Sequence, residues 1–187
     1  MASPGSRRRC RCRYDMNWFM IVLRIIHIGA GVFWAGSALL LVAYVNPAIE
    51  ESGAEGAHVM RQMAGPGRLG MSLGIAALLS TVAGLLLYWI ASGGLNWSWI
   101  SSGPGIGFTV GGVAGVAAFV YSMIVTSPAA ARYAKIREQY LAATGRPDPD
   151  VGVEYVNLRS QVSNAGILSA VLLAIAVLAM SAARYLG

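Results

Sequence analysis

Two ionisable side chains, Arg24 and His27, lie well inside a long apolar stretch of this sequence. Placing such groups at membrane depth costs free energy, so each of them favours a functional role. They are three residues apart and share a helix face that continues through Gly31 and Trp34. An imidazole nitrogen can ligate haem iron, Gly31 would leave room for a flat macrocycle one turn beyond the histidine, and Arg24 would lie near the haem propionates. The pattern predicts a haem b site at these four residues.

The same two residues also have an interpretation without a cofactor. His27 would then be a neutral imidazole that hydrogen-bonds to a hydroxyl or carbonyl group of a neighbouring helix. Arg24 lies only ~10 Å along a helix from Asn17, so its side chain can extend to the lipid headgroups. Because none of the apolar stretches contains Asp or Glu, its counter-charge must come from a bound anion, a lipid phosphate, the water interface or another chain.

A third candidate set is His58, Met60 and Met63, whose imidazole and thioether groups suit Cu(I). The alternative is that both methionines are apolar contacts of a segment at the membrane surface. His58 is not expected to share a haem with His27. About 27 Å of helical rise separates His27 from Val45, so the two imidazoles should lie near opposite faces of the bilayer.

The surrounding sequence places these residues in a membrane. The chain has 187 residues, of which 56% are apolar and 12% charged, and its mean hydropathy is +0.59. Soluble domains usually carry about 25% charged residues. Four apolar stretches are each long enough to cross a hydrocarbon core of about 30 Å as a helix, and they lack the alternation of membrane strands. We therefore predict an all-α, four-transmembrane-helix bundle with spans at about 18–45, 69–91, 106–125 and 162–183.

Local patterns predict where the helices end and where they pack. Helix 1 should end before Asn46-Pro47, because proline lacks a donor and discourages further helix. Ser127 and Pro128 are typical of an N-cap and a first helical position, so a separate amphipathic helix is expected over 129–144. Three rows of small residues predict close helix contacts. They are Gly107, Gly111 and Gly115, then Gly70, Gly74 and Ala77, and finally Ala170 and Ala174.

The basic residues are informative about membrane topology and do not indicate nucleic-acid binding. The net charge is +6, and an arginine-rich segment, 1–16, is expected to be a flexible tail before a single membrane domain at 17–187. Basic residues at span ends contact lipid headgroups, so no nucleic-acid partner is expected. An even number of spans places both termini on one side. If translation starts at Met16 and not at Met1, the positive charges place both long connections in the cytoplasm and the termini outside it.

The first half of the chain carries a longer pattern. Within the stretch 26–37, His27 is followed seven residues later by Trp-x-Gly. Together with Pro47, Arg68 and the stretch 82–84, this resembles small bacterial membrane proteins related to copper-resistance protein D and to the haem-associated protoporphyrinogen oxidase HemJ. The resemblance implies a four-helix bundle of the bacterial inner membrane in which the residue at the position of His27 ligates b-type haem or a metal.

The spans show no pair of carboxylates, no Ser-His-Asp set at matching depth and no relay of polar groups, so neither an enzyme nor a transporter is predicted. We predict an accessory or haem-b-associated subunit of a membrane redox system that serves electron transfer. Its expected partners are the lipid bilayer and other membrane protein subunits. The alternatives are a cofactor-free scaffold subunit of a membrane complex and a copper-handling membrane protein.

Overall fold

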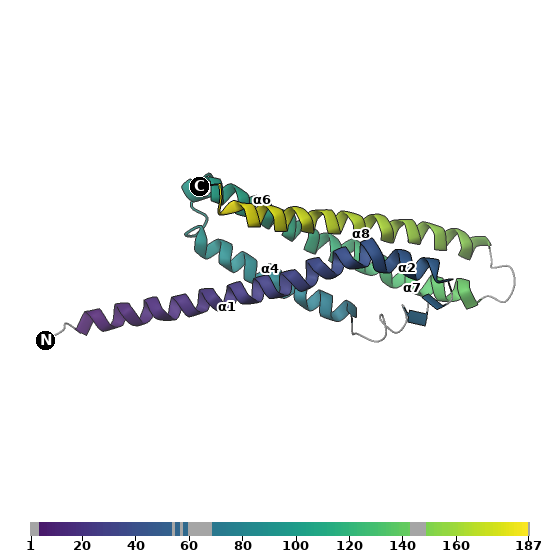
Figure 1. The fold of residues 1–187 in the computed structure, drawn as a ribbon, viewed down its shortest axis with the longest axis horizontal. Helices are drawn as coiled ribbons and strands as arrows, with labels where there is room; N and C mark the ends of the chain where they lie inside the picture. The colour runs from purple at the N-terminus through teal and green to yellow at the C-terminus, as the bar shows by residue number, and fades with distance from the viewer. Residues whose placement is uncertain (1–3, 54, 57, 60–68, 143–148, 187) are drawn as a thin grey trace.

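The computed structural model describes residues 4–53, 55, 56, 58, 59, 69–142 and 149–186. This part of the chain consists of helices and turns without strands, and four of its helices are long and apolar enough to cross a membrane (Figure 1). The predicted all-α bundle with four spans is thereby confirmed. The four candidate spans are Trp18–Glu51, Leu69–Ala91, Gly103–Tyr140 and Pro149–Ala183.

The first span is one continuous helix made of three segments. They are α1 (Pro4–Leu40), the π-helical segment η1 (Leu41–Val45) and α2 (Asn46–Glu51). Because α1 begins at Pro4, the helix extends through most of the segment that was expected to be a flexible tail. In Figure 1 this N-terminal end of α1 reaches past the other helices.

The predicted end of the first helix before Asn46-Pro47 is wrong, and the π-helical segment explains why. Proline has no N–H, and its ring clashes with the carbonyl group four residues earlier in an α-helix. In η1 the bonds run to the fifth residue back, as from the Asn46 N–H to the Leu41 carbonyl oxygen. This wider turn lets the helix pass through the proline.

The third span repeats this construction. It consists of α6 (Gly103–Tyr121), the π-helical segment η3 (Ser122–Thr126) and α7 (Ser127–Ala142). Ser127 has helical dihedral angles, and its N–H donates to the Ser122 carbonyl oxygen, so it is not the N-cap that was predicted. The amphipathic segment after it is helical as predicted, but it continues the third span. Its predicted end at residue 144 lies outside the described residues.

The two returning spans are α4 (Leu69–Ala91) and α8 (Pro149–Ala183), and α8 begins well before the predicted span start at Val162. A short helix, α5 (Trp97–Ile100), lies in the link between α4 and α6. Its Trp99 ring stacks on Phe108 of α6 at a centroid distance of 6.3 Å. This contact holds the link against the N-terminal part of α6, where the third span begins.

The helices pack as two pairs, α1 against α4 and α6 against α8 (Figure 1). The row of glycines on α6 contacts α8, as the prediction of close helix contacts at this row expects. A Cβ atom on Gly107 would lie 2.7 Å from the Ala183 Cβ, and one on Gly111 would lie 2.6 Å from the Met180 Cγ. Only glycine allows α6 and α8 to come this close. The pairs meet in a small apolar core of Trp34, Ala35, Ala76, Ala77, Ala118 and Leu173.

The predicted glycine row on α4 makes no such contact. A Cβ atom on Gly70 or on Gly74 would have nothing within 4 Å, whereas Ala77 is buried in the core. The glycine of α4 that closely contacts another helix is Gly84, which lies two turns beyond Ala77 and was not part of the predicted row. Spacing alone did not reveal this position, because close approach occurs only where α1 crosses α4.

Candidate functional site

His27 lies at the contact between α1 and α4 and is half-buried. Its Nδ1 is 2.8 Å from the carbonyl oxygen of Ser80, and the Ser80 hydroxyl donates to the His27 carbonyl oxygen at 3.1 Å. A carbonyl oxygen can only accept, so Nδ1 donates this hydrogen bond. The ring therefore bridges two membrane helices, as the interpretation without a cofactor expects.

One side of the imidazole ring lies against α4. A Cβ atom on Gly84 would lie 2.7 Å from the His27 Cε1 and 2.9 Å from its Nδ1, so the ring rests against bare backbone. The hollow expected beside Gly31 is filled by the Ser80 hydroxyl, whose oxygen would lie 3.0 Å from a Cβ there. A macrocycle lying flat against Gly31 does not fit between the two helices as they are arranged.

The other two residues of the predicted haem b site point elsewhere. Trp34 is buried in the core, where its ring meets Phe119 of α6 edge-on at a centroid distance of 6.3 Å. Arg24 is exposed and borders a hollow that is lined by residues of α1 alone. The structure thus does not bring Arg24, His27 and Trp34 together around one space.

Arg24 borders a shallow, almost entirely apolar hollow on the outside of α1. We call this surface the α1 outer face. Its residues are Ile21, Arg24, Ile25, Ile28 and Gly29. A Cβ atom on Gly29 would have nothing within 4 Å, so the hollow is open to whatever surrounds the protein. It is an exposed, apolar part of the surface of α1.

Copper binding stays a prediction. His58 is exposed, and both methionines of the set, Met60 and Met63, lie outside the described residues. Among the residues that the structure describes, no three or more His, Cys, Asp or Glu side chains gather in a way that could hold a metal ion.

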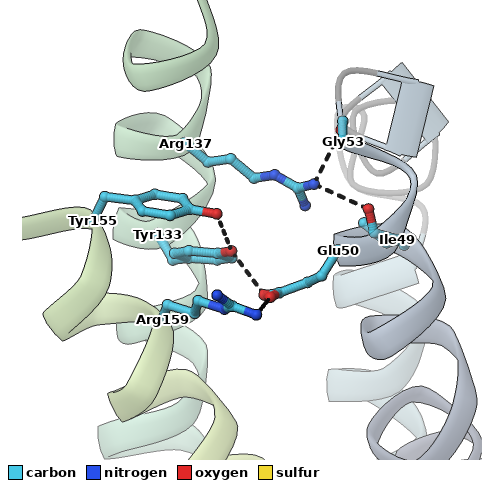
Figure 2. A network of polar contacts seen from close by, with 7 residues as sticks. All are labelled: Ile49, Glu50, Gly53, Tyr133, Arg137, Tyr155 and Arg159. Atoms are coloured by element: carbon cyan, nitrogen blue, oxygen red, sulfur yellow. Dashed lines mark hydrogen bonds and ion pairs between the residues drawn. The ribbon is translucent and has the colours of Figure 1, made fainter. Parts of the chain in front are cut away.

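A second polar cluster, which the sequence did not indicate as a site, joins α2, α7 and α8 (Figure 2). The Tyr133 hydroxyl donates to Glu50 Oε1 at 3.0 Å, and Arg159 forms an ion pair with Glu50 Oε2. Tyr155 stacks on Tyr133 with ring centroids 5.6 Å apart. The cluster connects the first helix pair to the second beyond the apolar spans.

The most buried charged member of this end of the bundle is Arg137, which is 4% exposed. The sequence predicted an amphipathic helix over 129–144 but did not mark this arginine, which lies between Tyr133 and Tyr140. The usable pattern was its position four residues after one tyrosine and three before the other, which puts all three side chains on one helix face.

In comparison with known proteins, the chain matches no family model, and no curated protein or solved structure is significantly similar to it. The resemblance of its first half to the copper-resistance and HemJ-related proteins therefore stays an expectation. The functional proposals below rest on the geometry of this chain.

Proposed function

We propose that this chain is a cofactor-free scaffold subunit of a membrane complex, and that its α1 outer face binds a transmembrane helix of another protein. The observation that carries the proposal is the exposure of Arg24 on the least buried of the four spans. His27 has partners on α4, whereas Arg24 has no acidic partner among the residues that the structure describes, so its counter-charge is still to be supplied.

The chemistry of the hollow defines the partner. Its floor is apolar and includes Gly29, which allows the backbone of a second helix to come close. Arg24 at its border favours an Asp or Glu on that helix, because a charge in lipid is strongly stabilised by an opposite charge. A second copy of this chain does not offer one, since none of its own apolar stretches contains an acidic residue.

Site-specific photocrosslinking in native membranes tests the proposal. A photoreactive amino acid replaces Ile28, which is 60% exposed on the α1 outer face, and a matched control replaces Leu178, which is 70% exposed on α8. We expect a discrete protein adduct from position 28 only, with a partner whose transmembrane helix carries an acidic residue. The adduct should disappear in Arg24→Leu and persist in Arg24→Lys.

Two outcomes would reject the scaffold proposal. One is that positions 28 and 178 give the same diffuse lipid adducts, which would mean that Arg24 extends to the headgroups. The other is an adduct at position 28 that survives Arg24→Leu, since the arginine would then have no part in the contact.

A haem-b-associated subunit of a redox system is the second proposal, and the hydrogen bond from His27 Nδ1 favours it. Histidines that ligate metals usually donate their other ring N–H to a carbonyl or carboxylate group, as Nδ1 donates to Ser80 here. Nε2 is then the atom that would hold the iron. Since the space beside Gly31 is filled, a haem would have to lie outside the contact between α1 and α4.

The absorption spectrum separates the two proposals. It should be recorded on the purified protein and on the complex isolated from native membranes. A Soret band that is lost in His27→Ala would support the redox role. A colourless protein in a colourless, intact complex would reject it and leave the scaffold.

A further inference from the structure

Arg137 lies on the inner side of α7, where α2, α7 and α8 meet, and its side chain points toward the end of α2 (Figure 2). It is 4% exposed, although arginine is almost never fully buried unless it is paired. Tyr133, one turn earlier on the same helix face, is buried as well. The guanidinium is thus held inside the protein and not at a solvated surface.

One nitrogen of this guanidinium has a structural role. Nη2 donates to the carbonyl oxygens of Ile49 at 3.2 Å and Gly53 at 3.4 Å, at the C-terminal end of α2. Carbonyl groups at a helix end lack partners within the helix and carry partial negative charge, so this contact stabilises α2. It explains the position of Arg137 but uses only Nη2.

The other two nitrogens, Nε and Nη1, are also buried, and neither has a hydrogen-bond partner in the described part of the structure. Arginine does not lose its proton in proteins, so the side chain cannot become neutral to escape this situation. A buried charge without a partner is strongly destabilising. Buried donors without partners in a native protein point to a bound water or ion.

Glu50 does not supply the missing negative charge. Its Oε1 accepts a hydrogen bond from the Tyr133 hydroxyl, and its Oε2 is in an ion pair with Arg159. The seven residues of the cluster in Figure 2 include two arginines and one carboxylate. Within this set of residues, the carboxylate pairs with Arg159, and the guanidinium of Arg137 has no carboxylate partner.

We propose that Arg137 binds a phosphate group at the membrane surface, with Nε and Nη1 as donors. Guanidinium groups match phosphate oxygens in geometry and in charge. Ile49 lies about 6 Å of helical rise beyond Val45, where the apolar stretch ends, so the site is at the depth of the headgroups. Gly53, whose carbonyl oxygen accepts from Arg137, is exposed, so this edge of the site is the one nearest to the surroundings of the protein.

An anionic phospholipid and free phosphate share this chemistry, and thermal unfolding of the purified full chain distinguishes them. The protein is held in a neutral detergent with added phosphatidylglycerol, phosphatidylcholine or inorganic phosphate. At concentrations about a hundredfold above Kd, the effective anion should raise the Tm by about 5 °C or more. The variant is Arg137→Gln, and Arg132→Gln, an exposed arginine on the same helix, is its matched control.

A Tm increase with phosphatidylglycerol alone that is absent in Arg137→Gln and kept in Arg132→Gln supports a lipid headgroup. An equal increase with inorganic phosphate supports free phosphate. If Arg137→Gln lowers the basal Tm but keeps the full increase, Arg137 only stabilises α2 and the proposal is overturned. It is also overturned if no anion raises the Tm of the unmodified protein. The proposal does not depend on the α1 outer face, so it can fail without affecting the scaffold role.

Discussion

The two helix pairs of this protein are built alike but are joined by different contacts. In each pair the first helix contains five π-helical residues, passes through a proline and continues as a helix beyond the apolar span. The second helix then returns along the first. These similarities make the two contacts, α1 with α4 and α6 with α8, directly comparable.

The contact between α6 and α8 depends on shape. Gly107 and Gly111 have no side chain, so α8 can lie directly against the backbone of α6 at these positions. The residues of α8 that face them are Ala176, Met180 and Ala183. The contact between α1 and α4 also packs a side chain on a glycine, the His27 ring on Gly84, and it adds a polar pair, His27 and Ser80. Hydrogen bonds between membrane helices are worth about 0.6 kcal/mol on average, whereas overpacking costs about 1–3 kcal/mol or more. The contact between α6 and α8 should therefore be the more sensitive to substitution.

The largest expected effect is that of Gly107→Leu. A Cβ atom there would lie 2.7 Å from the Ala183 Cβ and 2.9 Å from its Cα, and backbone cannot move aside as a side chain can. The helices must separate, at an expected cost of about 3 kcal/mol. Thermal unfolding in detergent, followed by circular dichroism, measures the loss.

Gly112→Leu is the matched control, because a Cβ atom at Gly112 has nothing within 4 Å on the same helix. Both substitutions raise helix propensity by a similar amount, so the difference between them isolates the contact. Equal stabilities of the two variants would show that the close approach of α6 and α8 does not stabilise the fold.

The sequence predicted the contact between α6 and α8 better than the contact between α1 and α4. Four spans followed from apolar length, and the glycine repeat on α6 indicated one helix face, because steric contact repeats with the helix. Gly84 is a single glycine at a crossing point, so no repeat marks it. The helix ends at Pro47 and Pro128 were predicted wrongly, since a π-helical turn depends on how bonds rearrange and not on residue type alone.

An intermediate effect is expected for Gly84→Ala. The new methyl group would lie 2.7 Å from the His27 Cε1, so the ring must turn and its bond to the Ser80 carbonyl oxygen must break. We expect a loss of about 1–2 kcal/mol. In a His27→Ala background the same change should cost almost nothing, so a double-mutant cycle should give strong coupling. Gly74→Ala, where a Cβ atom meets nothing, is the control. If the effects of Gly84→Ala and His27→Ala were additive, the contact between Gly84 and the His27 ring would be contradicted.

The candidate site was predicted only in part. The sequence identified His27 as unusual because it is an ionisable group in an apolar span, and the structure gives it a hydrogen bond to α4 that is compatible with both interpretations. Arg137 escaped notice because it lies in a polar helix, where an arginine is ordinarily solvated. Arg137 is buried against the end of α2, which is distant from it in sequence. The end of α2 lies next to Arg137 only because the first helix continues through Pro47.

The smallest expected effect is that of Ser80→Ala. This change removes the hydroxyl that donates to the His27 carbonyl oxygen but keeps the backbone oxygen that accepts from the ring, so we expect a loss of about 0.6 kcal/mol. The change also empties the space beside Gly31, where a Cβ atom would lie 3.0 Å from the hydroxyl oxygen.

Gly31→Ala should therefore be destabilising in the unmodified protein and tolerated in the Ser80→Ala variant, as unfolding of the four proteins would measure. Ser160→Ala, which removes an exposed hydroxyl bonded within α8, controls for the loss of a serine. If Ser80→Ala cost as much as Gly84→Ala, the hydroxyl and not the fit of the ring against bare backbone would hold α1 to α4. The two helix pairs would then differ in the kind of force that joins them, and not only in its strength.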